Sequence, residues 1–293
     1  MHDRRGHNHQ AYLWQYSRPG GAVVFDFRLG RGREGPKQFL GNYSGILQTD
    51  GYVAYEQVGG PGMVHACCWT HTRRGFCDVV KLNPGDVVAT PIVEKIGELF
   101  AIDAVAREQG LKVDARQALR REKAPAVLDA IKTAVESARA SALPGSTLGK
   151  ACQYTLGLWP KLIRFLDYAE LELSTSLAEN SIRPIALGRK NWIHIGSPQA
   201  GPKVAAILSI IETCRRIKLT GARISVRRFT RPGQPAITTS IRAHPHRLGR
   251  APPITHNLKS SSMGLACFGL TLTVKRSKPG RVPKTFPQRV PDS

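Results

Sequence analysis

The sequence predicts a domain of the α/β or α+β class, with a mixed sheet, an α-helical insertion and a mostly disordered C-terminal tail. Changes of pattern along the chain carry this prediction. Residues 1–88 contain short strand-like runs, whereas residues 89–170 place apolar side chains at helical spacing. Residues 171–218 form a second helical region, and residues 219–293 are basic and rich in proline. Strands followed by helices in this order indicate a sheet domain that carries a helical insertion.

A β-hairpin is predicted near the start of the chain. Residues 11–18 (AYLWQYSR) alternate apolar and polar side chains, and residues 22–29 (AVVFDFRL) form a second strand-like run. Pro19, Gly20 and Gly21 lie between the two runs and are typical turn residues. Two runs joined by such a short turn predict an antiparallel pair.

Shorter elements are expected before residue 70. Pro36 suits the first turn of a short helix that continues to residue 43. Residues 46–49 (ILQT) predict a brief strand that ends at Asp50. We expect residues 52–57 to begin a helix and residues 63–69 (MVHACCW) to form a further strand.

Helical periodicity dominates residues 90–167. Apolar side chains recur there three or four residues apart, at Ile92, Ile96, Leu99, Ile102, Val105, Ala106, Ala118, Leu119, Val127, Leu128, Ile131 and Val135. Turn-forming residues divide the stretch into several helices at 83–85, Gly110 and 144–145. A second helical block is expected over residues 176–218, interrupted at residues 188–202.

The charge of the chain favours a polyanionic partner such as nucleic acid. The 293 residues include 43 Lys and Arg against 21 Asp and Glu, which gives a formal net charge of +22. The last 75 residues hold 14 of these basic residues, a single acid, and nine of the 20 prolines. We therefore expect residues 219–293 to be mostly disordered. Within them, residues 263–274 (MGLACFGLTLTV) are an isolated apolar run without a visible strand partner.

Several classes of protein are disfavoured. The chain has no run of about 18 consecutive apolar residues, so a membrane protein is not expected. Its N-terminus lacks the apolar core of a signal peptide, which predicts a cytoplasmic protein with reduced cysteines. The chain also lacks the phosphate-binding pattern G-x-x-x-x-G-K-[ST], so use of ATP is not expected.

Two acids are candidates for chemistry on a phosphodiester, which uses carboxylates to hold divalent cations. Asp50 follows a short apolar strand and precedes Gly51, so its carboxylate is expected at the edge of a sheet. Glu179 lies at the start of a predicted helix and is followed by basic residues. The structural alternatives are an ordinary turn acid for Asp50 and a first-turn acid that complements the helix dipole for Glu179.

The residues around these acids resemble a known family. The stretches are 45–55 (GILQTDGYVAY), 65–76 (HACCWTHTRRGF) and 178–216 (AENSIRPIALGRKNWIHIGSPQAGPKVAAILSIIETCRR). In this order they resemble the transposases of the insertion-sequence-66 family, and the resemblance runs from about residue 9 to residue 218. It implies a ribonuclease H-like fold in which two Asp and one Glu hold two Mg²⁺ or Mn²⁺ ions. The second Asp corresponds to Asp50 and the Glu to Glu179.

The resemblance also implies DNA as the partner, both at the ends of a mobile element and at a target, with paired copies of the protein on two DNA ends. Arg183, Arg189 and Lys190 are expected to contact phosphates without reading the base sequence. His71 and Arg74 match the family pattern Cys-Trp-x-His-x-x-Arg and are candidates for contacts with the DNA backbone. The chemistry implied is metal-dependent strand cleavage and strand transfer.

The chain departs from the family pattern at both ends. The first catalytic Asp of the family lies in an Asp-Glu-Thr motif on the first strand of the sheet, and this motif is absent. We therefore expect a truncated copy whose sheet lacks its first strand, with two inner edges unpaired and weak or absent catalysis. The resemblance stops near Lys218. The alternative function is a non-catalytic remnant that occupies DNA or pairs with a full-length transposase.

Overall fold

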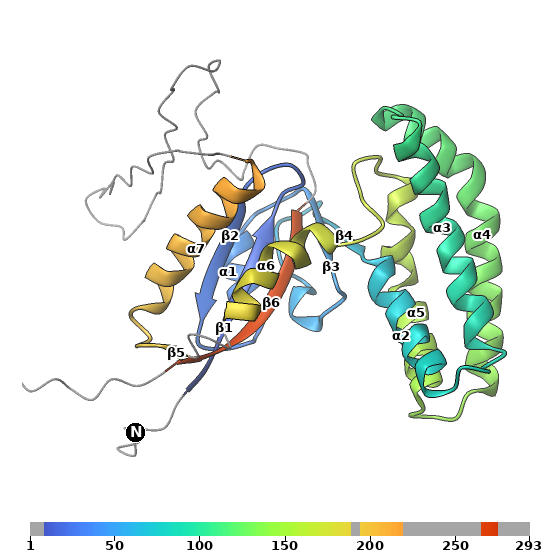
Figure 1. Ribbon diagram of the computed structural model, residues 1–293, viewed down its shortest axis with the longest axis horizontal. Helices are drawn as coiled ribbons and strands as arrows, with labels where there is room; N and C mark the ends of the chain where they lie inside the picture. The colour runs from blue at the N-terminus through green and yellow to red at the C-terminus, as the bar shows by residue number, and fades with distance from the viewer. Residues whose placement is uncertain (1–8, 189–193, 219–264, 275–293) are drawn as a thin grey trace, which may run out of the picture.

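The computed structural model describes residues 9–188, 194–218 and 265–274. These residues form a mixed α/β structure in which helices cover both faces of one sheet and a helical bundle lies beside the edge of that sheet (Figure 1). The strand order is β2-β1-β6-β3-β4, and β5 pairs with β6 away from this path. The predicted combination of strands with a helical segment is confirmed.

The predicted hairpin is confirmed. It consists of β1 (His9–Ser17) and β2 (Val23–Arg28), which pair antiparallel with Tyr12 opposite Arg28 and Ser17 opposite Val23. Alternate residues of β2 are buried, as expected for a strand with one face on the core. In contrast, residues 13–17 of β1 are all buried, which is typical of an inner strand with both faces covered.

The short elements that follow are confirmed with one exception. The helix α1 (Glu34–Leu40) carries Pro36 in its first turn, and the strands β3 (Ile46–Thr49) and β4 (Val64–Cys67) pair in parallel. The prediction that residues 52–57 begin a helix was wrong. Only one 3-10 turn, η1 (Val53–Tyr55), forms there, because the backbone becomes extended at the next residue and the following one has a positive φ.

The centre of the sheet differs from the prediction. It is formed by β6 (Leu265–Val274), which runs antiparallel to β1 and parallel to β3. The expectations that this run has no partner and that the inner edges of the sheet are unpaired were wrong. Local patterns cannot reveal such a pairing, because the partner strands lie at the opposite end of the sequence. The rest of the tail that was predicted to be disordered lies outside the described residues.

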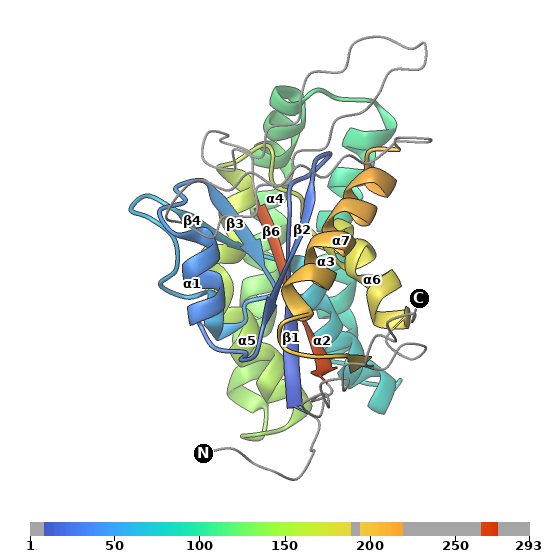
Figure 2. The same cartoon turned by 90° about the vertical axis from the view of Figure 1, so that its left-hand side faces the viewer.

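Helices lie over both faces of the sheet (Figure 2), and each face has its own apolar core. One face is covered by α6 (Ser176–Gly188) and α7 (Gly201–Arg216), whose side chains pack on Leu13 and Phe25. The other face is covered by α1 and η1, which enclose Trp14. Adjacent residues of β1 thus point to opposite cores, as the pleat of a strand requires.

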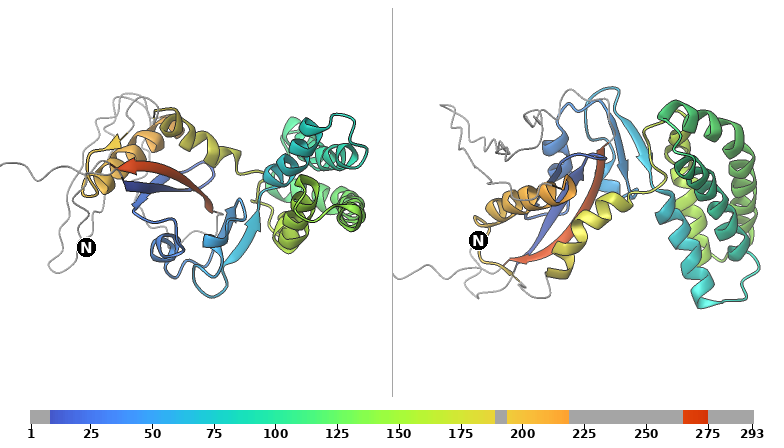
Figure 3. Two further views of the ribbon diagram at one scale, coloured as in Figure 1. Left: turned by 90° about the horizontal axis from the view of Figure 1, so that it is seen from below. Right: turned by 45° about the horizontal axis from the view of Figure 1, so that its top comes forward.

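The helical bundle lies beside β4, as the views in Figure 3 show, and its apolar core continues onto Ile46 of β3 and onto Ala66 and Cys67 of β4. Its members are α2 (Trp69–Leu82), α3 (Ala89–Glu108), α4 (Val113–Ser141), α5 (Thr147–Leu162) and the short η2 (Ile163–Leu166). The helical spacing predicted its buried side chains, among them Ile92, Ile96, Leu99, Leu128, Ile131 and Val135. No helix in the described ranges has both the length and the apolar character that a membrane crossing requires.

Candidate functional site

Asp50 lies directly after β3, where the predicted strand ends. The four residues of β3 are buried, whereas Asp50 is partly exposed. Gly51 permits the sharp turn that follows, because its φ of +83° belongs to the left-handed region that favours glycine. The backbone N–H of Tyr52 donates to Asp50 Oδ1 at 3.0 Å, and the Tyr154 hydroxyl donates to the Asp50 carbonyl. One hydrogen bond therefore orients the Asp50 carboxylate, and the other holds its backbone.

Glu179 lies in the first turn of α6. Its backbone N–H donates to the carbonyl of Thr175 at 3.1 Å, so the helix begins just before it. Two basic groups from α2 approach its carboxylate: His71 Nε2 lies 3.6 Å from Oε1, and Arg74 Nη2 lies 3.7 Å from Oε2. The predicted residues His71, Arg74 and Glu179 are thus brought together. The Arg74 side chain is half exposed, which leaves part of it open to solvent.

His71 contacts Glu179 and is influenced electrostatically by Asp50. Burial lowers the pKa of this imidazole, but a hydrogen bond with Cys68 and the negative charge of that thiol outweigh burial and raise it. Glu179 and then Asp50 raise the pKa of His71 further through their charges. Both carboxylates therefore act on the same imidazole, although 128 residues separate them along the sequence.

Cys68 contributes to the same cluster from the end of β4. It is fully buried, and the backbone N–H of Thr175 donates to its Sγ at 3.3 Å. Burial raises the pKa of the Cys68 thiol, but hydrogen bonds with His71 and Thr175 outweigh burial and lower it below its usual value. Cys68 thus ties α2 to the segment that leads into α6.

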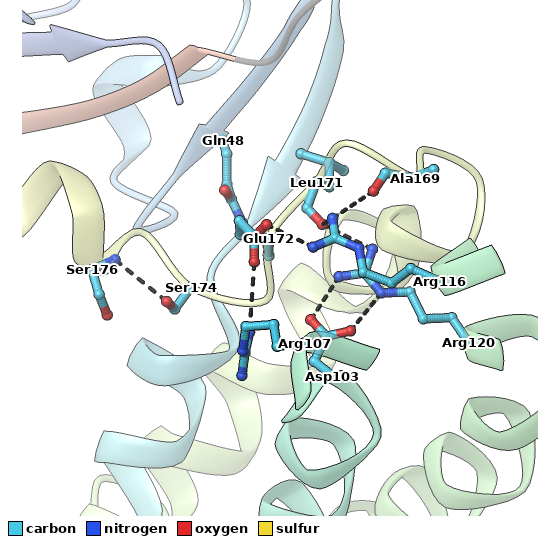
Figure 4. Close-up of polar contacts among 10 residues, drawn as sticks. All are labelled: Gln48, Asp103, Arg107, Arg116, Arg120, Ala169, Leu171, Glu172, Ser174 and Ser176. Atoms are coloured by element: carbon cyan, nitrogen blue, oxygen red, sulfur yellow. Dashed lines mark hydrogen bonds and ion pairs between the residues drawn. The ribbon is translucent and has the colours of Figure 1, made fainter. Parts of the chain in front are cut away.

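That segment, residues 169–175, is held by hydrogen bonds from both the bundle and the sheet (Figure 4). Gln48 Nε2 donates to the Glu172 carbonyl at 2.6 Å, and the Trp69 backbone N–H donates to the Leu173 carbonyl at 2.9 Å. Gln48 precedes Asp50 by two residues on β3, whereas the segment leads directly to Glu179. These contacts therefore fix the two acid-bearing elements relative to each other.

A buried ion pair anchors the same segment to the bundle. Arg120 donates from Nε and Nη2 to the two carboxylate oxygens of Asp103, each at 2.7 Å, and from Nη1 to the Leu171 carbonyl at 2.9 Å. The side chains of Arg120 and Asp103 are 1% and 2% exposed. Arg116 adds hydrogen bonds to the carbonyl of Ala169 and to the carboxylate of Glu172. Figure 4 shows these side chains converging on the segment from α3 and α4.

The carboxylates suit a divalent cation in one specific respect. Glu179 Oε1 is buried and accepts no hydrogen bond; its basic neighbour His71 Nε2 lies 3.6 Å away, so this oxygen could also serve as a metal ligand. Mg²⁺ is commonly held by one or two carboxylates, with water and substrate oxygens completing its shell. Among the described residues, no group of three or more His, Cys, Asp or Glu side chains is arranged to hold a metal ion. A cation held by Asp50 and Glu179 therefore stays a prediction, in which water or a phosphate would supply the other ligands.

The remaining predicted site residues are placed as follows. Arg183 is exposed on α6, one turn after Glu179. Arg189 and Lys190 lie outside the described residues. Sequence reasoning missed Tyr154, Cys68 and Gln48, because their roles depend on contacts with residues 104, 107 and 124 positions away. A signal was present only for Cys68, which belongs to the Cys-Trp-x-His pattern that pointed to His71.

Comparisons with known proteins place the chain in a family. The family model described as "Transposase IS66 family" matches residues 1–203, which is more than half of the chain. The chain belongs to the IS66 transposase family. No solved structure matches it. The assignment of Asp50 and Glu179 as catalytic carboxylates of an IS66 transposase stays a prediction, which the contact of Glu179 with His71 supports.

Two similar proteins come from Sinorhizobium fredii (strain NBRC 101917 / NGR234). The chain is similar to "Uncharacterized protein y4jD" with 31% identity over 201 residues, and to "Uncharacterized protein y4qI" with 30% identity over 226 residues. These alignments cover 66% and 72% of the chain but only 39% and 41% of the relatives. The chain thus spans about two fifths of the length of these relatives.

Proposed function

We propose that the described residues form a ribonuclease H-like catalytic domain of a DNA transposase. Membership of the IS66 family supports this proposal. The sheet also supports it, because the central strand β6 runs antiparallel to β1 of the hairpin and parallel to β3, the strand that precedes Asp50. The proposed substrate is DNA at the ends of a mobile element and at its target, and the proposed reactions are strand cleavage and strand transfer.

The observation that carries this proposal is the contact of Glu179 with His71 and Arg74, at 3.6 and 3.7 Å, in a member of the IS66 family whose Asp50 directly follows a buried strand. Glu179 lies in the first turn of α6, whereas its two basic partners come from α2. An acid that only complements the dipole of its own helix would not require two basic partners from another helix. The geometry therefore favours a site over the purely structural interpretation of Glu179.

Asp50 and Glu179 would hold Mg²⁺ or Mn²⁺ in this proposal. The cation would supply Lewis-acid activation of a phosphodiester and of the oxygen that attacks it. His71 and Arg74 balance the charge of Glu179 and keep its carboxylate in place. Arg183, exposed on the same helix, would contact a DNA phosphate as a positioning contact.

A second candidate function is a DNA-binding protein that performs no chemistry, either alone or paired with a complete transposase. One observation favours it for this chain. The central strand β6 (LACFGLTLTV) contains no Asp or Glu, so it adds no third carboxylate to Asp50 and Glu179. Catalysis by this chain is therefore proposed to be weak or absent, while contacts with DNA are retained.

A nicking assay on supercoiled plasmid DNA separates the two candidates. The purified full chain is incubated with Mg²⁺ or Mn²⁺, beside Asp50→Ala and the control Asp129→Ala, which changes an exposed acid of α4. Nicking that is lost in Asp50→Ala alone supports the enzyme. If all three proteins are inert but bind duplex DNA with a steep dependence on salt, the non-catalytic function is supported. Absence of both activities contradicts both candidates.

A further inference from the structure

The sheet is continuous only because of β6. In the order β2-β1-β6-β3-β4, the strands β1 and β3 do not pair with each other. Without β6, the sheet would consist of two separate two-stranded pieces: the β1–β2 hairpin and the parallel pair β3–β4. Two-stranded pieces are marginal in water, so the central position must be filled for this domain to be stable.

Both strands next to β6, β1 and β3, form backbone pairs with it. β1 pairs with β6 at nine consecutive positions, from His9 opposite Val274 to Ser17 opposite Ala266. Residues 13–17 are buried on both faces because α6 and α7 cover one side of the sheet and α1 and η1 cover the other. On the other side of β6, Ala266 pairs with Gln48 of β3, so Ala266 has a paired residue on both neighbouring strands.

The sequence of β6 suits this place. Residues 265–274 contain no charged residue and no proline, and they include two threonines, which favour strands. By contrast, Lys275 and Arg276 follow immediately, and proline and basic residues recur on both sides of this run. A central strand needs a backbone N–H at every position and no charged side chains. Among residues 219–293, this run meets both requirements best.

β6 also lies outside the part of the chain that defines its family. The family match covers residues 1–203 and therefore includes β1, β2, β3 and β4 but not β6. The central strand is supplied by a segment that is separated from the last residue of α7 by 48 residues. The family segment and the central strand are thus contributed by distinct parts of the sequence.

We propose that the gap between β1 and β3 is a strand-binding slot, and that this chain fills it in cis with its own residues 265–274. The segment completes the backbone hydrogen bonds of the sheet without adding an acid. Continuing the pairing of Gln48 with Ala266 by two residues gives Phe268 the register position beside Asp50. The sheet is therefore complete as a fold, whereas the position next to Asp50 carries no carboxylate.

Engineered disulfides test the register in the full chain. Gln10 lies directly opposite Thr273 at the exposed end of β1, so Gln10→Cys with Thr273→Cys places two thiols at disulfide distance. The control pairs Gln10→Cys with Leu272→Cys, which is shifted by one residue and faces the other side of the sheet. Peptide mapping should find an intrachain 10–273 disulfide under mild oxidation, and no 10–272 disulfide. Equal yields in both variants, or an interchain 10–273 disulfide in a dimer, would overturn occupancy in cis.

A proline scan provides an independent measurement. Leu270→Pro removes a backbone donor in the centre of β6, whereas Lys259→Pro makes the same change elsewhere in the tail. We expect Leu270→Pro to lower the melting temperature by about 6–12 °C or to abolish cooperative unfolding. Lys259→Pro should leave it within about 2 °C. Equal melting temperatures for Leu270→Pro and Lys259→Pro would show that residues 265–274 do not fill the slot.

Discussion

Removing the carboxylate of Asp103 is expected to destabilise the bundle strongly. Its partner Arg120 is 1% exposed and would lose two hydrogen bonds of 2.7 Å, keeping only the Leu171 carbonyl and the face of the Phe165 ring. Breaking a buried ion pair from one side leaves an uncompensated charge and costs about 3–5 kcal/mol. At about 2–4 °C per kcal/mol for a chain of this size, Asp103→Ala should lower the melting temperature by roughly 6–20 °C.

The measurement is thermal and urea unfolding of Asp103→Ala beside Asp129→Ala. Asp129 is an exposed acid on α4, and its loss should change stability by no more than about 0.5 kcal/mol. Because Arg120 also holds the segment that leads to Glu179, near-ultraviolet circular dichroism should change in Asp103→Ala only. If Asp103→Ala and Asp129→Ala unfold at the same urea concentration, the buried pair does not anchor this segment.

Three further changes have defined outcomes. Gly51→Ala should cost about 1–3 kcal/mol in unfolding experiments because of its positive φ, whereas Gly30→Ala in an open loop should be nearly neutral. Burial raises the pKa of Glu212 above its usual 4.5, so ionisation costs the folded state stability as pH rises through that range. Glu212→Gln should therefore melt higher than the natural chain at pH 7, and this difference should shrink towards pH 4. Phe268→Asp should tighten Mn²⁺ binding about tenfold relative to Phe268→Asn, by adding a charge beside Asp50; unchanged affinity would contradict the register of β6.

The sequence patterns were most informative where structure is local. Alternation predicted β1 and β2, and apolar spacing predicted α3 to α5, because each pattern reflects burial within its own element. β6 could not be predicted in this way. Its run of apolar residues was visible, but its two partner strands lie some 220 residues or more away in the sequence, and pairing over that separation leaves no local trace.

The candidate site could be predicted only in part, because some of its contacts also join residues that are far apart in the sequence. Asp50 and Glu179 were found from their places after a strand and at the start of a helix, whereas His71 and Arg74 were found through the family resemblance. The structure brings His71, Arg74 and Glu179 within contact distance. The groups that hold them were not found, because Gln48 acts through the carbonyl of Glu172, which can belong to any residue type. Because every residue has a backbone carbonyl, such an acceptor cannot be recognised from the sequence.

The most direct test of the proposed centre is a Mn²⁺ titration of the full chain, followed by electron paramagnetic resonance of the free ion. If Asp50 and Glu179 hold one cation together, the natural chain should show a site that Asp50→Asn and Glu179→Gln each weaken at least about tenfold. Asp129→Asn, which alters an exposed acid of the bundle, should bind as the natural chain does. Equal Mn²⁺ affinity in all four proteins would contradict the assignment of these two carboxylates to a metal centre.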